Sequence, residues 1–329
     1  MFLAAQIATA RADAAHRYAY PMSHRVSVVV RTKDRPGFLR RALEDIASQS
    51  FGDIEVVVVN DGGVREEVDD VVWSSSLADR VSVVDTVAPG GRCAAANLGV
   101  LSTGAEYIVL HDDDDLWHPH FLAKTVALLD ASPQDAGVMV ATEIVEEEQR
   151  DGEWVETSRV PYWAGLTHVN FTSLLEINRA VPISFLYRRA VHQELGGYDE
   201  SLETVEDWEF YLRLTARHPV AFLGGTPLAY WMHRPAAEGA DGNSMFELEG
   251  AHARDDLAVR DRELTRWVRE NGSGLPLYIG LIEKNLDAEM ERRHEELLAA
   301  ISRRGEDLAR EIYARHPIWR RLRRLRRRR

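Results

Sequence analysis

Four consecutive aspartates, residues 112–115, are the side chains of this chain best suited to chemistry. They directly follow a short apolar run at residues 107–110, which predicts a buried strand. Open α/β sheets bind their ligands at the carboxyl ends of such strands. Adjacent carboxylates repel one another, so a fold that gathers four of them is expected to hold a divalent cation and a phosphate-bearing ligand. The cluster therefore predicts a metal-diphosphate site.

The residues around the cluster exclude two other cation or phosphate motifs. An EF-hand loop requires a glycine at its sixth position, where this chain has Trp117. A Walker B strand would accompany a GxxxxGK[ST] loop upstream, and the sequence contains none. A solvated acidic turn without function is the alternative that the cluster alone leaves open.

Polar side chains also follow the other predicted strands. Thr32, Asp61 and Arg92 each lie after one of the first three apolar runs, which are residues 26–31, 54–59 and 81–84. Arg92 lies at a helix start led by two glycines, and an arginine beside free backbone N–H groups favours a phosphate. The simpler alternatives are a solvated arginine at 92 and a turn-forming aspartate at 61.

Two later stretches carry groups that could transfer a proton or bind a metal. Glu206 and Asp207 open a predicted helix for which Thr204 is the expected N-cap. Acids at this position could also serve only to cap the helix and offset its dipole. His233 ends a predicted strand beside a tryptophan, where a histidine is usually a packed core residue. The residues alone leave the functional and the structural interpretation open for both stretches.

The elements that must position these groups alternate strand and helix. In the first unit, Asp34 is the expected N-cap and Pro36 the first-turn proline of a helix that follows residues 26–31. Four such units predict an α/β fold with a mostly parallel sheet, helices on both faces and right-handed crossovers. Asp151-Gly152 predicts a hairpin turn. Further strands are expected at residues 137–142, 144–148, 153–156, 183–187, 220–223 and 228–232, and helices at 170–178 and after Pro119.

The composition sets outer limits on the protein. A chain of 329 residues with 45% hydrophobic content can form one large domain and an appendage. Cys93 is the single cysteine, which excludes an internal disulfide and favours a reducing cytosol. No apolar run approaches the roughly 20 residues that cross a bilayer. Residues 1–22 lack the features of a signal peptide, and we expect a disordered extension or a misassigned start, with Met22 as the alternative first residue.

The C-terminal part differs in composition from the rest. Residues 246–316 read as charged helix, in which apolar residues recur in steps of seven and four at Met290, Leu297, Ile301, Leu308 and Ile312. This stripe either packs back on the domain or forms a homo-oligomer.

The last segment, residues 317–329, is the basic end of an acidic protein. Eight of its final ten residues are arginines, whereas the whole chain has a net charge of −13. Apolar residues interleave with these arginines, as in amphipathic segments that bind anionic membranes. The acidic remainder argues against a nucleic-acid partner.

With these residues in view, residues 26–245 resemble the family 2 glycosyltransferases of the GT-A fold, including their DxD motif. The resemblance rests on the order and spacing of six motifs, which are VSVVVRT at 26–32 with Arg35-Pro36, VVVNDG at 57–62, AANLG at 95–99, DDDDLW at 112–117 with Pro119, GGYDE at 196–200 and EDW at 206–208. The family often has an arginine where this chain has Ala96, and Arg92 is a candidate to replace its charge.

The resemblance implies a role for particular residues. It implies that a nucleotide-sugar donor is bound by Thr32, Arg35, Asp61, Arg92, Asn97, Asp112 and Asp113, with Thr32 and Asp61 at the nucleobase and Asp112 or Asp113 at the ribose. It further implies that Mn²⁺ or Mg²⁺ is held by Asp114, Asp112 and His233, and that Asp207 is the catalytic base with Glu206 beside it.

The implied function is inverting, metal-dependent transfer of a sugar from a UDP- or dTDP-sugar to an acceptor hydroxyl. The expected acceptor is a glycan or a lipid-linked molecule in cell-surface glycan or glycoconjugate synthesis, and the expected location is the cytoplasm, including the inner membrane face. The alternative is a catalytically silent nucleotide-sugar-binding or scaffolding protein that acts through its helical tail. A nucleotidyltransferase is disfavoured, because no glycine-rich, lysine-bearing loop follows residues 26–31.

Overall fold

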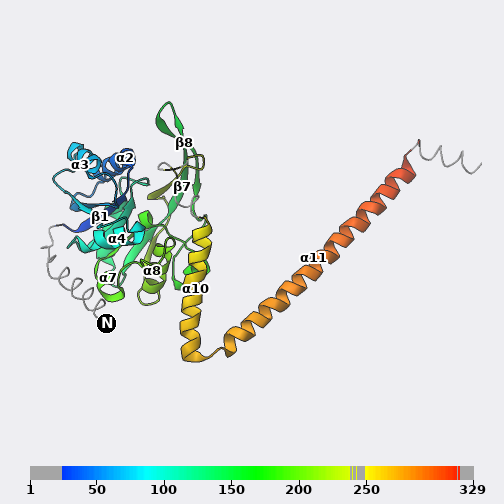
Figure 1. Cartoon of the computed structure of the whole chain (residues 1–329). Helices are drawn as coiled ribbons and strands as arrows, with labels where there is room; N and C mark the ends of the chain where they lie inside the picture. Colours follow the sequence, from blue (N-terminus) through cyan, green and yellow to red (C-terminus); the bar gives the residue numbers. More distant parts are fainter. Residues whose placement is uncertain (1–23, 238, 240–241, 243–248, 317, 319–329) are drawn as a thin grey trace, which may run out of the picture. The chain divides into compact units, whose positions relative to one another are not determined.

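The computed structural model describes residues 24–237, 239, 242, 249–316 and 318 (Figure 1). The chain forms two compact units, which divide between Val259 and Arg260. The expected N-terminal extension at 1–22 lies outside the described residues, as does the arginine-rich tail apart from Ile318. No helix in the described part of the chain is both long enough and apolar enough to cross a membrane.

The first unit is built on a seven-stranded sheet with the strand order β10-β6-β9-β4-β1-β2-β3. All neighbouring strands run parallel except β9, which is antiparallel to both β4 and β6. The predicted mostly parallel sheet is therefore confirmed. The strands are β1 (Val26–Thr32), β2 (Ile54–Asn60), β3 (Val81–Asp85), β4 (Tyr107–Asp112), β6 (Gly137–Val140), β9 (Phe185–Arg188) and β10 (Ala221–Leu223).

Helices cover both faces of this sheet, as the apolar strands require (Figure 1). Alternate β1 residues point to opposite faces, so Val28 belongs to one hydrophobic cluster and Val29 to the other. The first cluster contains residues of α2 (Pro36–Ala47), α3 (Arg65–Ser74) and α5 (Phe121–Ala131). The second contains residues of α4 (Gly91–Leu101), α6 (Phe171–Glu176), α7 (Ala190–Leu195), α8 (Glu206–Thr215) and α10 (Glu249–Asn271).

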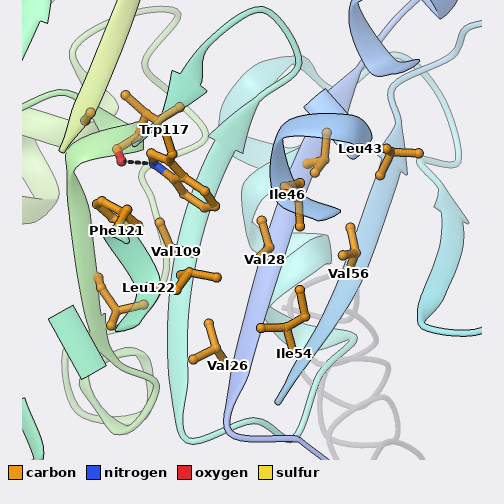
Figure 2. Close-up of a cluster of buried hydrophobic side chains, with 14 of the residues drawn as sticks. Val26, Val28, Leu43, Ile46, Ile54, Val56, Val109, Trp117, Phe121 and Leu122 are labelled. Carbon is orange, nitrogen blue, oxygen red and sulfur yellow. Dashed lines mark hydrogen bonds between the residues drawn. The ribbon is translucent and has the colours of Figure 1, made fainter. Parts of the chain in front are cut away.

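Figure 2 shows how the first cluster supports the end of β4. Trp117 stacks on Phe121 with 4.5 Å between ring centroids, above Val109 and Val28. The indole N–H of Trp117 donates a 2.7 Å hydrogen bond to the carbonyl oxygen of Ile183, in the 3-10 turn Pro182–Ser184. The turn that carries the four aspartates is thus anchored in the core immediately after it.

A second sheet has the strand order β5-β11-β7-β8. Its strands are β5 (Leu116–Trp117), β11 (Ala229–His233), β7 (Thr142–Arg150) and β8 (Glu153–Pro161). The predicted single strand at 137–142 is wrong in extent, because the chain passes from the first sheet to the second at Ala141. The predicted hairpin turn joins β7 and β8, with positive φ at both Asp151 (53°) and Gly152 (87°).

Two predicted helix caps are wrong. The N-cap of α2 is Arg35, because Asp34 adopts a φ of 53° and its carboxylate accepts the N–H of Val64 instead. The N-cap of α8 is Val205, also in the left-handed region at φ 54°. Thr204 does not cap the helix, because its N–H and its hydroxyl both donate hydrogen bonds to Asp255 of α10. The N-terminal part of α10 thus belongs to the first unit.

The second unit contains the rest of α10 and the helix α11 (Gly274–Arg315). α11 is 42 residues long, and it contains no buried side chain in the described part of the chain. Its apolar residues are therefore exposed over its whole length.

Candidate active site

The carboxyl ends of β1, β2 and β4 lie at the same edge of the main sheet. Thr32 is paired with Asn60 of β2, and Arg31 is paired with Asp112 of β4. Because these strands are parallel and in register, the polar residues that follow them emerge side by side. The sheet thus brings Thr32, Asp61 and the four aspartates to one edge, as the sequence predicts.

Arg31 connects the first aspartate of the cluster to the start of α8. Its Nε and Nη2 atoms donate to Asp112 Oδ1 at 2.8 and 2.6 Å, and its Nη1 donates to Glu206 Oε1 at 3.1 Å. Burial would lower the pKa of Arg31, but the charges of Asp112 and Glu206 raise it above its usual value. Burial would likewise raise the pKa of Asp112, yet Arg31 holds it below the usual range. The pKa shifts of Arg31 and Asp112 keep these two partners charged, and Arg31 bridges Asp112 to the buried carboxyl group of Glu206.

Arg35 and Arg234 contact the central aspartates of the cluster. Arg35 is ion-paired with Asp113 and lies 3.3 Å from Asp114 through Nη1, and Thr32 donates a 2.7 Å hydrogen bond to Asp113. Burial raises the pKa of Asp113 to about 7 despite the opposing charge of Arg35. Arg234 forms an ion pair with Asp114. The mutual repulsion of the carboxylates is thus offset by arginines of this chain, a source of compensation that our sequence argument did not consider.

The fourth aspartate fastens the second sheet to the cluster. Asp115 Oδ1 accepts the backbone N–H of Met232 in β11 at 2.9 Å. Burial, followed by the charge of Asp114, raises its pKa well above the usual value. The next residue is His233, which is paired in register with Glu146 of β7. Burial lowers the pKa of His233 to about 4, so its imidazole is neutral at physiological pH.

The chemistry of these side chains can be tested against a divalent cation. Within the described residues, no three His, Cys, Asp or Glu side chains come together as a group that could hold a metal. The expected metal ligands Asp112, Asp114 and His233 therefore do not form such a group. Asp112 is ion-paired with Arg31, and Asp114 is ion-paired with Arg35 and Arg234. Mg²⁺ is commonly held by one or two carboxylates together with substrate phosphates. The hard carboxylate of Asp114 fits that minimal role, with phosphate oxygens as the other ligands.

Asp61 accepts hydrogen bonds from the loop that leads into α4. Its Oδ1 accepts the N–H of Gly90 at 2.8 Å and the hydroxyl of Thr86 at 2.9 Å, and its Oδ2 accepts the N–H of Gly91 at 3.0 Å. Two of the backbone N–H groups that we expected to be free for a phosphate, those of Gly90 and Gly91, are thus used by a carboxylate of the chain. The structure assigns Asp61 the turn-forming role that the sequence left open, and Asp61 thereby shapes the edge beside Arg92.

Asn97 holds the turn at residues 196–200. Its amide nitrogen donates to the Tyr198 carbonyl and to Glu200 Oε1, both at 2.9 Å, and its oxygen accepts the N–H of Tyr198 at 2.8 Å. A Cβ atom at Gly197 would overlap Asn97 Oδ1, which explains the glycine. Both ends of the Asn97 amide are occupied, so the structure gives it a positioning role.

Asp207 and Glu206 are neighbouring carboxylates with different partners. Glu206 accepts Arg31 and lies 3.9 Å from Nε of Arg92, the residue expected at the donor. Asp207 Oδ2 accepts the side-chain amide of Asn178 at 2.8 Å, and its Oδ1 accepts the N–H of Trp208 at 2.8 Å. Burial, and then the charge of Glu206, raises the pKa of Asp207 to about 7. A carboxylate with this pKa can accept and release a proton near neutrality.

Our sequence reasoning missed three residues of the site. Arg31 was visible as the single charged residue of an otherwise apolar strand, and Arg234 as the residue after His233. No sequence signal identifies Asn178, because its contact with Asp207 joins positions 29 residues apart through the tertiary fold.

Comparisons with known proteins place this geometry in context. Residues 24–270 match the family model described as glycosyltransferase-like family 2. The chain is 30% identical over 194 residues to the uncharacterized glycosyltransferase YwdF of Bacillus subtilis. The match covers 57% of this chain and 67% of the relative. The chain is also 28% identical over 190 residues to the PGL/p-HBAD biosynthesis glycosyltransferase of Mycobacterium tuberculosis, with 57% and 68% covered.

Other relatives are longer proteins, and solved structures share the fold. An uncharacterized glycosyltransferase of Rickettsia felis is 24% identical over 201 residues, and the match spans only 32% of its length. The structure of S. aureus TarS 1-349 in complex with UDP-GlcNAc superimposes with a TM-score of 0.53 at 18% identity, covering 76% of this chain and 75% of that one. At this identity the likeness concerns the fold.

Proposed function

Because the chain belongs to glycosyltransferase-like family 2 and is an enzyme of the glycosyltransferase class, we propose that it transfers a sugar from a UDP- or dTDP-sugar to an acceptor hydroxyl with inversion. One observation carries the proposal. Across one edge of the sheet, Arg31 joins Asp112 of the aspartate cluster to Glu206, and the next residue is Asp207, a buried aspartate with a pKa near 7. A general base close to a site for the donor diphosphate is the arrangement that transfer of the sugar in a single displacement requires.

In the proposed reaction, Asp207 accepts the proton of the attacking hydroxyl. Its pKa of about 7 leaves a large ionised fraction at neutral pH while keeping it basic enough to take the proton. The N–H groups of Asn178 and Trp208 fix its two oxygens, so the carboxylate is oriented before the acceptor binds. Attack from the side of Asp207 on the face opposite the leaving group inverts the anomeric centre.

The donor would lie at the aspartate cluster. Thr32 and Asp113 contact the nucleoside, and the side chains of Arg35 and Arg234 provide positive charge beside the diphosphate. Asp114 would hold Mn²⁺ or Mg²⁺, which would supply further positive charge for the leaving group. The structure of the fold relative TarS with UDP-GlcNAc supports a nucleotide sugar as the donor class.

We further propose that the acceptor is a glycan or a lipid-linked molecule, met in the cytoplasm at the inner membrane face. The name of the mycobacterial relative, a PGL/p-HBAD biosynthesis glycosyltransferase, supports a biosynthetic role. The arginine-rich residues 317–329 would contribute about 1 kcal/mol per arginine near an anionic leaflet.

α11 supports a role in self-association beside catalysis. Its exposed apolar residues recur every 11 positions along the helix, as Leu286, Leu297 and Leu308 in one row and Met290, Ile301 and Ile312 in the next. An 11-residue period corresponds to about 3.67 residues per turn and favours a right-handed supercoil. We propose that a second copy of α11 covers this stripe. A silent scaffold would need the stripe and not the buried base.

The catalytic proposal is tested by Asp207→Asn in the full chain. We expect donor binding to persist, because Asp207 lies outside the donor site, and transfer to fall by about 10²- to 10⁴-fold. Calorimetric titration of the nucleotide sugar and a transfer assay measure the two effects, and Asp79→Asn on the surface is the control. Turnover at the wild-type rate in Asp207→Asn would remove Asp207 from the mechanism.

A further inference from the structure

The backbone that leads into Asp207 has an unusual conformation. Val205, two residues before Asp207, has a φ of 54°. Within the described residues, the other residues with a positive φ, glycines aside, are Asp34 and Asp151, and aspartate tolerates this left-handed region. Valine does not, because its branched Cβ crowds the backbone there. A conformation of this kind persists only where surrounding contacts hold it, and such positions cluster at functional sites.

The contacts that hold this backbone come from α10. Asp255 Oδ2 accepts the N–H of Glu203 at 2.9 Å, the N–H of Thr204 at 2.9 Å and the hydroxyl of Thr204 at 3.1 Å. Asp255 is only 5% exposed, and Thr204 is fully buried. One carboxylate oxygen therefore fixes the two residues that directly precede Val205.

The place of Asp255 in its helix indicates that this contact is specific. Ala251, Asp255 and Val259 are buried and recur every four residues, so they form the inward face of the N-terminal part of α10. A carboxylate on such a face loses its hydration, and hydrogen bonds must replace the lost water. Burial would raise the pKa of Asp255, but the N–H groups of Thr204 and Glu203 hold it below the usual range. Asp255 is thus an ionised acceptor at neutral pH.

α4 holds the same loop from its other end. The side-chain amide of Asn97 donates to the Tyr198 carbonyl oxygen at 2.9 Å, and the thiol of Cys93 donates to the Leu202 carbonyl oxygen at 3.1 Å. The loop at residues 198–204 is therefore fastened by side chains of α4 and α10 before the chain enters α8.

We propose that Asp255 is a positioning residue that fixes the general base Asp207 by holding Val205 in the left-handed conformation. This inference rests on the proposed function, because it adds a residue to the same reaction. The carbonyl oxygen of Val205 accepts the N–H of Glu209 at 3.0 Å, so the backbone at Val205 sets the direction of the first turn of α8. Asp207 lies in that turn, and Asp255 acts on it through the backbone.

Loss of the Asp255 carboxylate should let Val205 move to a negative φ. The first turn of α8 would then shift, and Asp207 would lose its hydrogen bond from Asn178 and part of its burial. Because burial is the main cause of the raised pKa of Asp207, this pKa should fall toward its ordinary value. The other titratable and charged groups around Asp207 stay in the chain, and they are Glu206, Arg31, Tyr162, Tyr198 and Tyr211.

The test uses three variants of the full chain beside wild type. Asp255→Ala removes the acceptor, and the double variant Asp255→Ala/Val205→Gly also removes the need to hold the backbone, because glycine adopts a positive φ without steric cost. Asp261→Ala is the matched control, since Asp261 is an exposed aspartate of the same helix. If Asp255→Ala does not fold, Asp255→Asn replaces it in both chains, because asparagine keeps the size and one oxygen acceptor.

Transfer is measured as release of UDP or dTDP from UDP- and dTDP-sugars with Mn²⁺ and a mixture of methyl glycosides as acceptors. We expect Asp255→Ala to lower kcat about tenfold, equivalent to about 1.4 kcal/mol in the barrier, with the donor KM unchanged. The rising limb of kcat/KM against pH should move to lower pH. The double variant should return kcat to within about threefold of wild type and restore the limb. Asp261→Ala should match wild type.

Hydrogen exchange of the amides at residues 203–209 is followed by mass spectrometry on the same samples. Faster exchange there in Asp255→Ala, with a lower kcat and a limb at lower pH, supports the assignment. A folded Asp255→Ala with the wild-type kcat and pH profile overturns it, and so does an equal kcat in Asp255→Ala and the double variant. Absence of transfer by wild type would contradict the proposed function instead, and the exchange measurement would still test whether Asp255 holds this segment.

Discussion

Glu206 and Asp207 show how two adjacent carboxylates acquire different chemistry from their surroundings. Glu206 is ion-paired with Arg31, whereas Asp207 accepts hydrogen bonds from the N–H groups of Asn178 and Trp208. Burial and the charge of Glu206 therefore act on Asp207 and raise its pKa. Different surroundings can thus give two adjacent carboxylates different roles, with Asp207 as the proton acceptor.

This difference predicts the pH dependence of the reaction. Because Asp207 must be ionised to accept a proton, kcat/KM should rise with pH through about 7 and level off above it. Glu206→Gln removes a negative charge that raises the pKa of Asp207, so the rising limb should move to lower pH. Initial rates between pH 5 and 9 measure both profiles. A limb that stays in place in Glu206→Gln would separate the titrating group from Asp207.

Arg31 predicts a large effect on stability from one buried side chain. Arg31→Met removes the hydrogen-bonded ion-pair partner of the buried Glu206 and of the partly exposed Asp112, and the free energy of unfolding should fall by roughly 3–5 kcal/mol. Arg25→Met is the matched control, because Arg25 also bridges two acids, Glu106 and Asp130, but is 37% exposed, and its loss should cost about 0–1 kcal/mol. Urea unfolding at pH 7 compares the variants, and equal losses in the two would contradict the account.

Among the elements, α4 and α8 show how contacts distant in sequence decide which groups are used at a helix start. At the N-terminus of α4, the distant Asp61 accepts the N–H groups of Gly90 and Gly91. The N-terminus of α8 begins at a left-handed Val205, because Asp255 of α10 takes the groups of Thr204. Local sequence suggests a cap from the nearest polar residue, while long-range contacts decide which group is used.

The apolar stripe of α11 leads to a prediction about self-association. If a second copy covers the apolar stripe, Leu297→Arg should shift the protein toward the monomer, since Leu297 lies within the stripe. Leu298→Arg is an unusually close control, because the neighbouring leucine has similar exposure (51% against 58%) but lies about 100° around the helix. Sedimentation velocity at micromolar concentration measures the monomer fraction. Equal behaviour of the two variants would exclude the stripe as the interface.

For the whole molecule, the parallel sheet and the convergence of its strand ends could be predicted from the sequence. The reason is that apolar runs such as residues 54–59, with polar residues directly after them, specify both a strand and the edge at which it ends. The division of residues 137–142 at Ala141 was not predictable, because no glycine or proline marks a break there and only tertiary pairing separates the two strands. The arginine contacts could not be predicted for the same reason. Arg31 and Asp112 are 81 positions apart in the sequence, and Arg234 and Asp114 are 120 positions apart.

The central claim is a nucleotide-sugar site that uses a divalent cation at Asp114. The most direct measurement is thermal stabilisation of the full chain by UDP-, dTDP- and GDP-sugars, each with Mn²⁺ and with EDTA. Wild type, Asp114→Asn and Asp130→Asn are compared, each relative to its own ligand-free midpoint, because Asp130 is also an arginine-paired aspartate but lies outside the cluster. We predict stabilisation by a UDP- or dTDP-sugar that requires Mn²⁺, persists in Asp130→Asn and is lost in Asp114→Asn. Absence of a shift with every donor, or an equal shift in Asp114→Asn, would contradict the account.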